Sequence, residues 1–254
     1  MSAFNLSKTE FIAYLECPLQ FYIIRSLNQG IPYGSRGDRD YSEFSDDAKD
    51  GMFWHWWFEG FHDKYYEDIS NGQPAPAGET QKNTKIMKLF YEKERERFTK
   101  QPDFWFPKTT EQYLESENLR GEVDRIDQLN EQGDCLLIEY KKKKNQFDEQ
   151  ELLFYACLIN QVDGIISEEE SPIQITEVEV YYYLTGETMR RKLMEDEVAS
   201  FKNYLQSIKE EIFMPNWVRK EECDMRDTNC KFKRICKNIP ETLLLSNESQ
   251  KIVE

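Results

Sequence analysis

The sequence predicts a mixed α/β fold, α+β in arrangement, in which a central mixed sheet is flanked by helices. Three observations predict it: a strand pair over Arg120–Lys141, a helix over Asp148–Val162 that packs on this pair, and a strand in I-Q-I-T-E-V-E-V-Y-Y-Y-L, where apolar and polar residues alternate. Strands that are interspersed with helices along a chain are typical of a sheet covered by helices. The length of 254 residues suits one large domain.

Local signals predict the remaining elements. Ser7–Glu10 has the pattern of a capping box, which starts a helix, and Pro18 suits the first turn of the next helix. An aromatic-rich helix is expected over Asp46–Ile69, before a loop in N-G-Q-P-A-P-A-G-E. Further elements are an amphipathic helix over Thr84–Lys100, a short strand after the turn T-G-E, and a helix over Glu195–Phe213.

The strand pair carries the most informative motif. G-E-V-D-R-I-D places Asp124 on one strand, and C-L-L-I-E-Y-K places Glu139 and Lys141 on the next. Residues two apart on a strand point to the same face, so Glu139 and Lys141 can share a pocket with Asp124. A hairpin with solvated charges is the alternative, but Glu139 directly follows the apolar run Cys135–Ile138, where a carboxylate without a partner is costly. Two carboxylates and an ammonium suit a divalent cation, a phosphate and an activated water, which favours a nuclease.

The six cysteines fall into two groups. Cys135 and Cys157 lie inside apolar runs and are expected in the core. The other four, in polar or turn-like settings, are Cys17, Cys223, Cys230 and Cys236. Because no signal peptide opens the chain, disulfides are disfavoured, and four thiolates suit an iron-sulfur cluster or a structural zinc. The lack of paired Cys-x-x-Cys knuckles favours a 4Fe-4S cluster over zinc, with four unliganded thiols as the third alternative.

Five sequence motifs follow one another between Ser7 and Cys236. They are S-K-T-E-F-I-A-Y-L-E-C-P-L-Q-F-Y, G-M-F-W-H, G-E-V-D-R-I-D, I-E-Y-K and C-K-F-K-R-I-C. Together they resemble the RecB-like branch of the PD-(D/E)XK nuclease superfamily, and within it the CRISPR-associated exonuclease family, the fourth of the Cas proteins. The resemblance implies a restriction-endonuclease-like core and a single nuclease domain over residues 1–237. An iron-sulfur lobe would join about residues 1–30 to 215–237, and residues 238–254 would form a flexible tail.

The resemblance also implies roles for individual residues. His55, Asp124 and Glu139 would ligate Mg2+ or Mn2+, with the backbone carbonyl of Tyr140 as a further ligand. Lys141 would orient the attacking water or help to deprotonate it. Carboxylate oxygens suit these hard cations, which agrees with the implied ligands.

The two histidines receive different interpretations. The residues alone favour a buried core position for His55, because aromatic side chains surround it in the sequence. Its match to the Gly-x-x-x-His pattern, which begins here at Gly51, favours a metal ligand instead. His62 has no such match, and we expect it at the surface.

Two departures from the family pattern affect the predicted roles. The family has Gln and Tyr four residues apart on the helix after the active-site strand; Tyr155 fits as a catalytic residue, but Glu151 stands where Gln is expected. Gln150, one residue away, could contact DNA after a small helix rotation, or Glu151 could weaken DNA binding. Among the three C-terminal cysteines (Cys223, Cys230 and Cys236), the family has Cys-x-x-Cys before the last one; here Asp227 occupies the expected cysteine position and Cys223 lies four residues earlier.

Charge and hydropathy limit the kinds of partner and the location that the sequence predicts. The net charge of −15 argues against a simple DNA-binding surface, since phosphate contacts usually draw on clustered Lys and Arg. Lys142 and Lys144 extend from the active-site strand, so they are candidates for DNA contact, although lysine runs are more typical of solvated faces. No apolar stretch approaches the roughly 20 residues that cross a membrane, so a cytoplasmic protein is expected.

The metal-site pattern predicts a metal-dependent nuclease, and the resemblance implies that it is a DNA exonuclease that acts on single-stranded ends or overhangs. In a CRISPR system it would process spacer precursors beside the integrase, and as a solitary enzyme it would process DNA repair intermediates. The alternative is a catalytically weak or inactive module that binds DNA ends for a partner enzyme, which Glu151 and the shifted Cys223 favour. A zinc-stabilised interaction protein is the third hypothesis. The intact trio of Asp124, Glu139 and Lys141 favours the enzyme.

Overall fold

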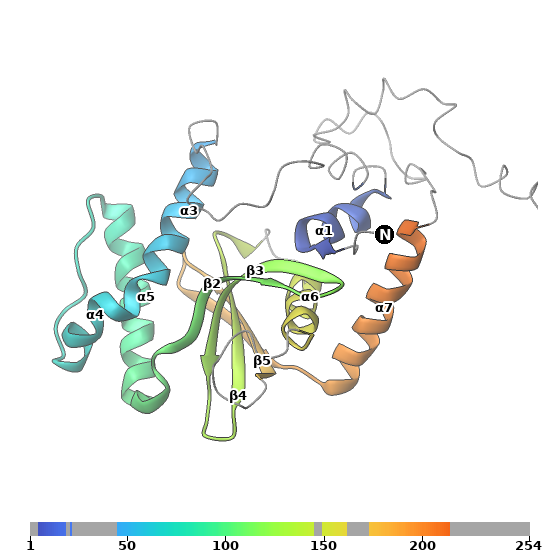
Figure 1. The fold of residues 1–254 in the computed structure, drawn as a ribbon. Coiled ribbons are helices and arrows are strands. Elements are labelled where there is room, and N and C mark those ends of the chain that lie inside the picture. The colour runs from blue at the N-terminus through green and yellow to red at the C-terminus, as the bar shows by residue number, and fades with distance from the viewer. Residues whose placement is uncertain (1–4, 19–20, 22–44, 145–148, 162–172, 214–254) are drawn as a thin grey trace, which may run out of the picture. The chain divides into compact units, whose positions relative to one another are not determined.

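A computed structural model describes residues 5–18, 21, 45–144, 149–161 and 173–213 (Figure 1). The chain divides into two compact units, one containing residues 1–5 and 40–199 and the other residues 6–39 and 200–254. The predicted class is confirmed, because the first unit has a central mixed sheet flanked by helices. No helix in the described ranges is long and apolar enough to cross a membrane.

The sheet of the first unit has the strand order β2-β3-β4-β5-β6. Its strands are β2 (Pro107–Glu115), β3 (Leu119–Gln128), β4 (Asp134–Lys141), β5 (Gln174–Tyr182) and β6 (Glu187–Lys192). β4 and β5 are parallel, whereas the other neighbouring strands are antiparallel. A parallel pair needs a crossover connection, and the chain provides it with α6 (Glu149–Ile159). The predicted strand pair and the strand after α6 are therefore confirmed, whereas β2 was not predicted.

Helices α3 (Asp46–Glu59), α4 (Phe61–Ser70) and α5 (Gln81–Lys100) lie together on one side of the sheet (Figure 1). The sequence predicts a helical, aromatic-rich stretch over about Asp46–Ile69, and the structure divides it into α3, which ends at Glu59, and α4, which starts at Phe61, with Gly60 between them. Glycine is a poor helix former, which explains a break at this position. The break is compatible with packing of both helices into one aromatic core.

The aromatic core fixes α3 against the end of β4. The Phe58 ring lies 4.5 Å from the ring of Tyr140 and 4.5 Å from that of Phe90, measured between centroids. The buried aromatic residues of this core are Trp54, Phe58, Phe61, Tyr65, Phe90, Tyr91, Trp105, Tyr140, Tyr181 and Tyr183. Because large buried rings contribute about 1.5–3 kcal/mol each through burial, this core determines where α3 presents its side chains.

Strand β4 is buried on both faces. Leu136, Ile138 and Tyr140 belong to the aromatic core, so Glu139 between them points to the opposite face. Cys135 and Cys157 are fully or almost fully buried, which confirms the prediction that they are core residues. Burial raises the pKa of the Cys135 thiol to about 11, so the thiol stays protonated near neutral pH.

Helix α6 approaches β3 closely at a glycine. A Cβ atom added to Gly121 would lie 2.9 Å from Cε1 of Tyr155, whose ring is buried. Such a distance is shorter than real Cβ contacts, so any larger residue would displace the ring. Gly121 therefore permits the close contact that holds Tyr155 of α6 against β3.

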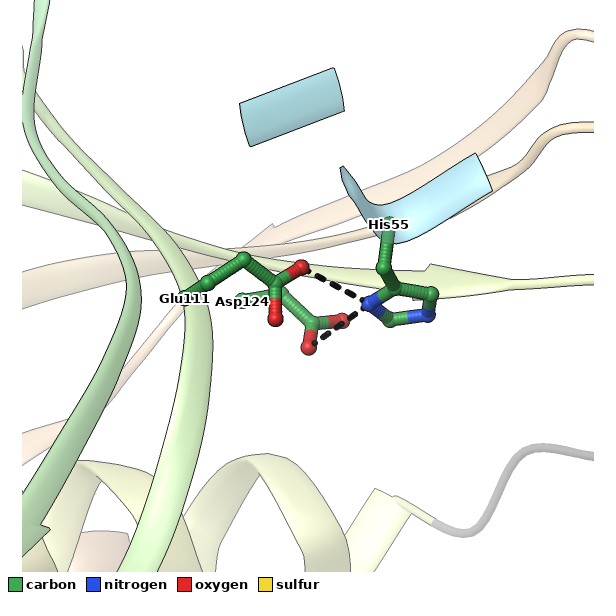
Figure 2. A group of neighbouring side chains, drawn as sticks. All are labelled: His55, Glu111 and Asp124. Atoms are coloured by element: carbon green, nitrogen blue, oxygen red, sulfur yellow. Dashed lines mark hydrogen bonds and ion pairs between the residues drawn. The ribbon is translucent and has the colours of Figure 1, made fainter. Parts of the chain in front are cut away.

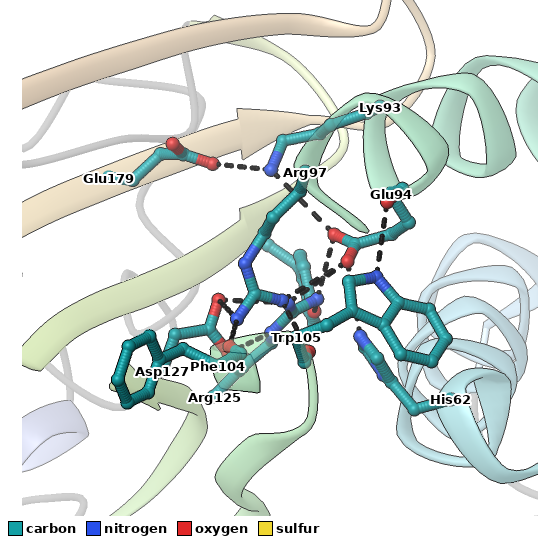
Figure 3. Close-up of polar contacts among 10 residues, drawn as sticks. His62, Lys93, Glu94, Arg97, Phe104, Trp105, Arg125, Asp127 and Glu179 are labelled. Atoms are coloured by element: carbon teal, nitrogen blue, oxygen red, sulfur yellow. Dashed lines mark hydrogen bonds and ion pairs between the residues drawn. The ribbon is translucent and has the colours of Figure 1, made fainter. Parts of the chain in front are cut away.

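A buried ionic network joins α5 to β3 (Figure 3). Arg125 Nη1 lies 3.0 Å from Glu94 Oε1, and Arg125 Nε lies 2.7 Å from Asp127 Oδ1. The side chains of all three residues are completely buried. Arg125 is fully paired in this way, and its charge is compensated by two carboxylates. The network therefore ties α5 to the residue that immediately follows Asp124.

His62 belongs to this network, so the expectation that it lies at the surface is wrong. The residue is 2% exposed, and its Nε2 lies 3.1 Å from Glu94 Oε2. Its ring also packs on Trp105, with centroids 4.6 Å apart. Burial and the nearby charge of Arg125 lower the pKa of His62, which keeps the imidazole neutral. Only the packing of α4 on α5 could reveal this partner.

The second unit confirms the predicted capping box. Ser7 Oγ accepts a hydrogen bond from the Glu10 backbone N–H at 3.2 Å, and the Ser7 N–H donates to Glu10 Oε2 at 2.9 Å. These bonds start α1 (Lys8–Glu16), which follows β1 (Leu6–Ser7). Helix α7 (Glu195–Phe213) has the predicted bounds, and its residues from Ser200 onward belong to this unit.

Candidate metal centre

The carboxylate of Asp124 lies where the β3–β4 ladder ends. The last residue pair of this ladder joins Arg125 to Ile138. Immediately beyond it, Asp124 Oδ2 accepts a hydrogen bond from the backbone N–H of Tyr140 at 2.7 Å. The side chain of Asp124 therefore bridges the two strands, next to Glu139.

Three potential metal ligands converge at this point (Figure 2). His55 Nδ1 from α3 lies 2.8 Å from Glu111 Oε1 of β2 and 3.3 Å from Asp124 Oδ1 of β3. One ligand atom from each residue lies within 4.8 Å of the other two. Two carboxylates and an imidazole fit Mn2+ or Mg2+, because these cations prefer oxygen ligands and Mn2+ also accepts imidazole nitrogen. The structure thus brings together the predicted His55 and Asp124.

Glu111 completes the trio, although the sequence analysis did not identify it. The pairs Thr110–Arg125 and Gln112–Val123 place Glu111 opposite Asp124 on the neighbouring strand. Glu111 has a φ of 47°, a left-handed conformation that is uncommon for residues other than glycine. Such backbone strain costs on the order of 1–3 kcal/mol and occurs preferentially at functional sites. The only local signal was the weak strand pattern P-K-T-T-E-Q-Y-L-E, whose register the sequence does not specify.

The electrostatics of the trio favour a cation between the carboxylates. Burial alone would lower the pKa of His55, but the charge of Asp124 and the hydrogen bonds to Asp124 and Glu111 raise it to about 10. The imidazole therefore holds a proton at neutral pH and balances the two acids. A divalent cation can take over this role, since metal binding to imidazole displaces a proton.

Glu139 and Lys141 form a second group on the neighbouring strand. Lys141 Nζ lies 2.8 Å from Glu139 Oε1 and 2.6 Å from Glu151 Oε2 of α6. The Glu139 side chain is 3% exposed, and Glu139 is not a member of the group formed by His55, Glu111 and Asp124. Lys141 is thus held between two carboxylates. The residue that departs from the family pattern, Glu151, is in direct contact with the predicted catalytic lysine.

The hydroxyl of Tyr155 interacts electrostatically with Asp124 of β3 and Glu139 of β4. Burial, followed by the charges of Glu139 and Asp124, raises the pKa of its hydroxyl well above the ordinary value. The hydroxyl therefore stays protonated and can donate a hydrogen bond. Gln150 is half-buried on the same helix, and its predicted contact with DNA stays a prediction, as does ligation by the Tyr140 carbonyl.

The two predicted DNA-contacting lysines form ion pairs within the protein. Lys142 Nζ lies 2.9 Å from Asp47 Oδ1 and 2.8 Å from Asp50 Oδ2, and these hydrogen bonds raise the pKa of Lys142. Lys144 Nζ lies 3.0 Å from Glu187 Oε2. Lys142 thereby fastens the end of β4 to the first turns of α3, which carries His55. Contact of either lysine with DNA stays a prediction.

The predicted cluster cysteines are only partly described. Cys17 is a half-buried free cysteine at the C-terminal end of α1. Cys223, Cys230 and Cys236 lie outside the described residues, as do the predicted tail and most of the iron-sulfur lobe. The 4Fe-4S cluster therefore stays a prediction.

Comparison with known proteins agrees with the geometry of the metal centre. A family model described as the PD-(D/E)XK nuclease superfamily matches residues 5–237. No curated protein is significantly similar to the chain. Nucleases of this superfamily use Mg2+ or Mn2+, and the matched range contains every described residue of the candidate site. The chain therefore belongs to the PD-(D/E)XK nuclease superfamily.

Proposed function

We propose that this protein is a deoxyribonuclease whose divalent cation is held by His55, Glu111 and Asp124. The observation that carries the proposal is the convergence of an imidazole and two carboxylates within 4.8 Å at the end of the β3–β4 ladder. Membership of a nuclease superfamily supports the same reaction class. When bound, Mg2+ or Mn2+ would lower the pKa of a water molecule and neutralise charge on the phosphate.

The residues beside the trio would orient the reaction. Lys141 carries an ammonium that two carboxylates hold in place, so it is suited to orient the attacking water or to contact a phosphate oxygen. Glu139 lies one residue from the backbone N–H that binds Asp124, which supports its predicted role as a further ligand. Tyr155 can donate its hydroxyl proton in a hydrogen bond. These roles for Glu139, Lys141 and Tyr155 belong to the proposal.

We further propose an exonuclease that acts on single-stranded DNA ends or overhangs. The order of motifs along the chain supports this substrate, through its resemblance to the CRISPR-associated exonucleases. Processing of CRISPR spacer precursors beside the integrase and processing of repair intermediates are both compatible with it.

A second candidate is a DNA-end-binding module with weak catalysis. The Glu151 carboxylate favours it, because it lies 2.6 Å from Lys141 Nζ and draws the ammonium away from an incoming phosphate. The group of His55, Glu111 and Asp124, which can hold a metal ion, favours the enzyme.

Degradation of end-labelled single-stranded DNA with Mn2+ or Mg2+ tests the enzymatic proposal. We expect cleavage to require the metal and to fall about 10²–10⁴-fold in Glu139→Ala. Glu131→Ala, which changes an exposed acid in the β3–β4 turn, is the matched control and should cleave like the wild type. If wild type and Glu139→Ala both bind DNA and neither cleaves it, the end-binding module is the better account.

We also propose that Cys17, Cys223, Cys230 and Cys236 bind a 4Fe-4S cluster. Four thiolates from two distant segments support it. Anaerobically purified protein should contain iron and sulfide, and Cys17→Ala should lose most of both. Zinc without iron would favour the zinc-stabilised alternative. A preparation that contains neither iron nor zinc would show that these thiols are unliganded.

A further inference from the structure

Helix α3 presents two exposed aromatic rings beside the metal-binding histidine. Trp56 directly follows His55 and is 71% exposed. Phe53 is 41% exposed and lies three residues before Trp56, so the two rings share one face of the helix. Trp54 and Phe58 of the same helix are completely buried in the aromatic core. Trp56 and Phe53 therefore leave apolar surface in solvent, which is a feature of binding sites.

The two rings lie close to the place where the phosphodiester must bind. The Cα atoms of Trp56 and His55 are about 3.8 Å apart, as in any pair of consecutive residues. Consecutive side chains on a helix are rotated by about 100°, so the Trp56 ring flanks the His55 side chain, and a nucleotide next to a phosphate bound at His55 can reach this ring. The exposed pair, here called the α3 aromatic pair, therefore lies within one helical turn of the proposed ligand His55.

Among the described residues, the two lysines at the end of β4 are already paired with carboxylates of the protein. Lys142 pairs with Asp47 and Asp50, and Lys141 pairs with Glu139 and Glu151. The whole chain carries a net charge of −15. Non-specific attraction of DNA depends on Lys and Arg that neutralise phosphates, so another interaction must supply part of the affinity. Stacking of bases on aromatic side chains can supply it for any sequence, because every base has a π-face.

We propose that Trp56 and Phe53 form a nucleobase-stacking subsite that holds single-stranded DNA next to the metal centre. The inference rests on the proposed nuclease function and names the state of its substrate. Bases in a duplex stack on their neighbours and present no free face to a protein ring. The α3 aromatic pair therefore selects unpaired nucleotides at an end or overhang.

Equilibrium binding without divalent cations tests the subsite apart from catalysis. Fluorescence anisotropy with a labelled single-stranded oligonucleotide should give a Kd about 10-fold weaker for Trp56→Ala, whereas Trp56→Phe should retain most of the affinity. The matched control is Tyr66→Ala, which removes a 43% exposed ring of α4 that packs on Phe106. This control should bind like the wild type.

An oligonucleotide of the same length with abasic sites separates stacking from backbone contacts. The Trp56→Ala defect should disappear on this oligonucleotide, since no base remains to stack. Equal affinity of wild type and Trp56→Ala for the normal oligonucleotide, together with an unchanged KM for its cleavage, would overturn the subsite and leave the nuclease proposal intact. Binding that depends on Trp56 without any metal-dependent cleavage would support the subsite and contradict the nuclease.

Discussion

Glu111→Gln is expected to weaken Mn2+ binding at least about 10-fold and to reduce DNA cleavage at least in proportion. The substitution keeps the size of the side chain but removes one of the two negative charges that face His55. Loss of residues that merely orient metal ligands costs about 10–100-fold in affinity, so loss of a direct ligand should cost no less. Titration calorimetry with Mn2+ measures the affinity, and end-labelled DNA measures cleavage.

A neighbouring acid provides the control for this prediction. Glu117→Gln removes the same charge from an exposed position in the β2–β3 turn. It should bind Mn2+ and cleave DNA like the wild type. Equal behaviour of Glu111→Gln and Glu117→Gln would show that Glu111 is not a ligand, and it would leave His55 and Asp124 to bind the cation with Glu139.

Glu94→Gln is expected to lower the free energy of unfolding by about 3 kcal/mol. The reason is that Arg125, which is completely buried, would lose one of its two carboxylate partners and keep only Asp127. Urea unfolding measures the change. Glu96→Gln on the same helix is the control, because Glu96 and its partner Lys100 are each 68% exposed, and it should unfold at the same urea concentration as the wild type. Similar losses in both variants would show that the buried network does not stabilise the fold.

The same network predicts how stability depends on pH. Burial alone would raise the pKa of Glu94, but the charge of Arg125, the hydrogen bond to His62 and the charge of Lys93 together outweigh burial and hold this pKa well below its ordinary value of 4.5. The stabilisation by Glu94 is therefore present above about pH 4.5 and is lost as the pH falls through the lower folded pKa. The lowered pKa of His62 acts in the same direction below its ordinary value of 6.5. Between pH 6 and pH 3, the Tm should fall less steeply in Glu94→Gln than in the wild type.

The sequence identified residues whose placement depends on local pattern. Asp124, Glu139 and Lys141 lie on a strand pair whose apolar runs are visible in the sequence, and the capping box at Ser7 needs only residues three apart. Alternation and helical periodicity act over a few residues, so a single sequence reveals them. The break of α3 at Gly60 was missed, because the aromatic pattern continues on both sides of the glycine.

Long-range contacts account for what the sequence did not reveal. Glu111 enters the site through the register of β2 on β3, in which it stands opposite Asp124. His62 is buried because α4 packs on α5 and brings it to Glu94. Lys142 pairs with Asp47 and Asp50, which lie more than ninety residues earlier in the chain. Each contact depends on how distant elements pack, and local periodicity carries no information about that packing.

The sequence by itself therefore determined the mixed α/β class, the strand pair with its acidic residues and the candidate histidine. Only the tertiary structure decided that His55 and Asp124 meet a third ligand, Glu111, and that Lys141 lies between Glu139 and Glu151. The physical reason is that elements form from local periodicity and capping, whereas a metal centre needs side chains from separate elements within a few ångströms. Strand register and the aromatic core under α3 set those distances.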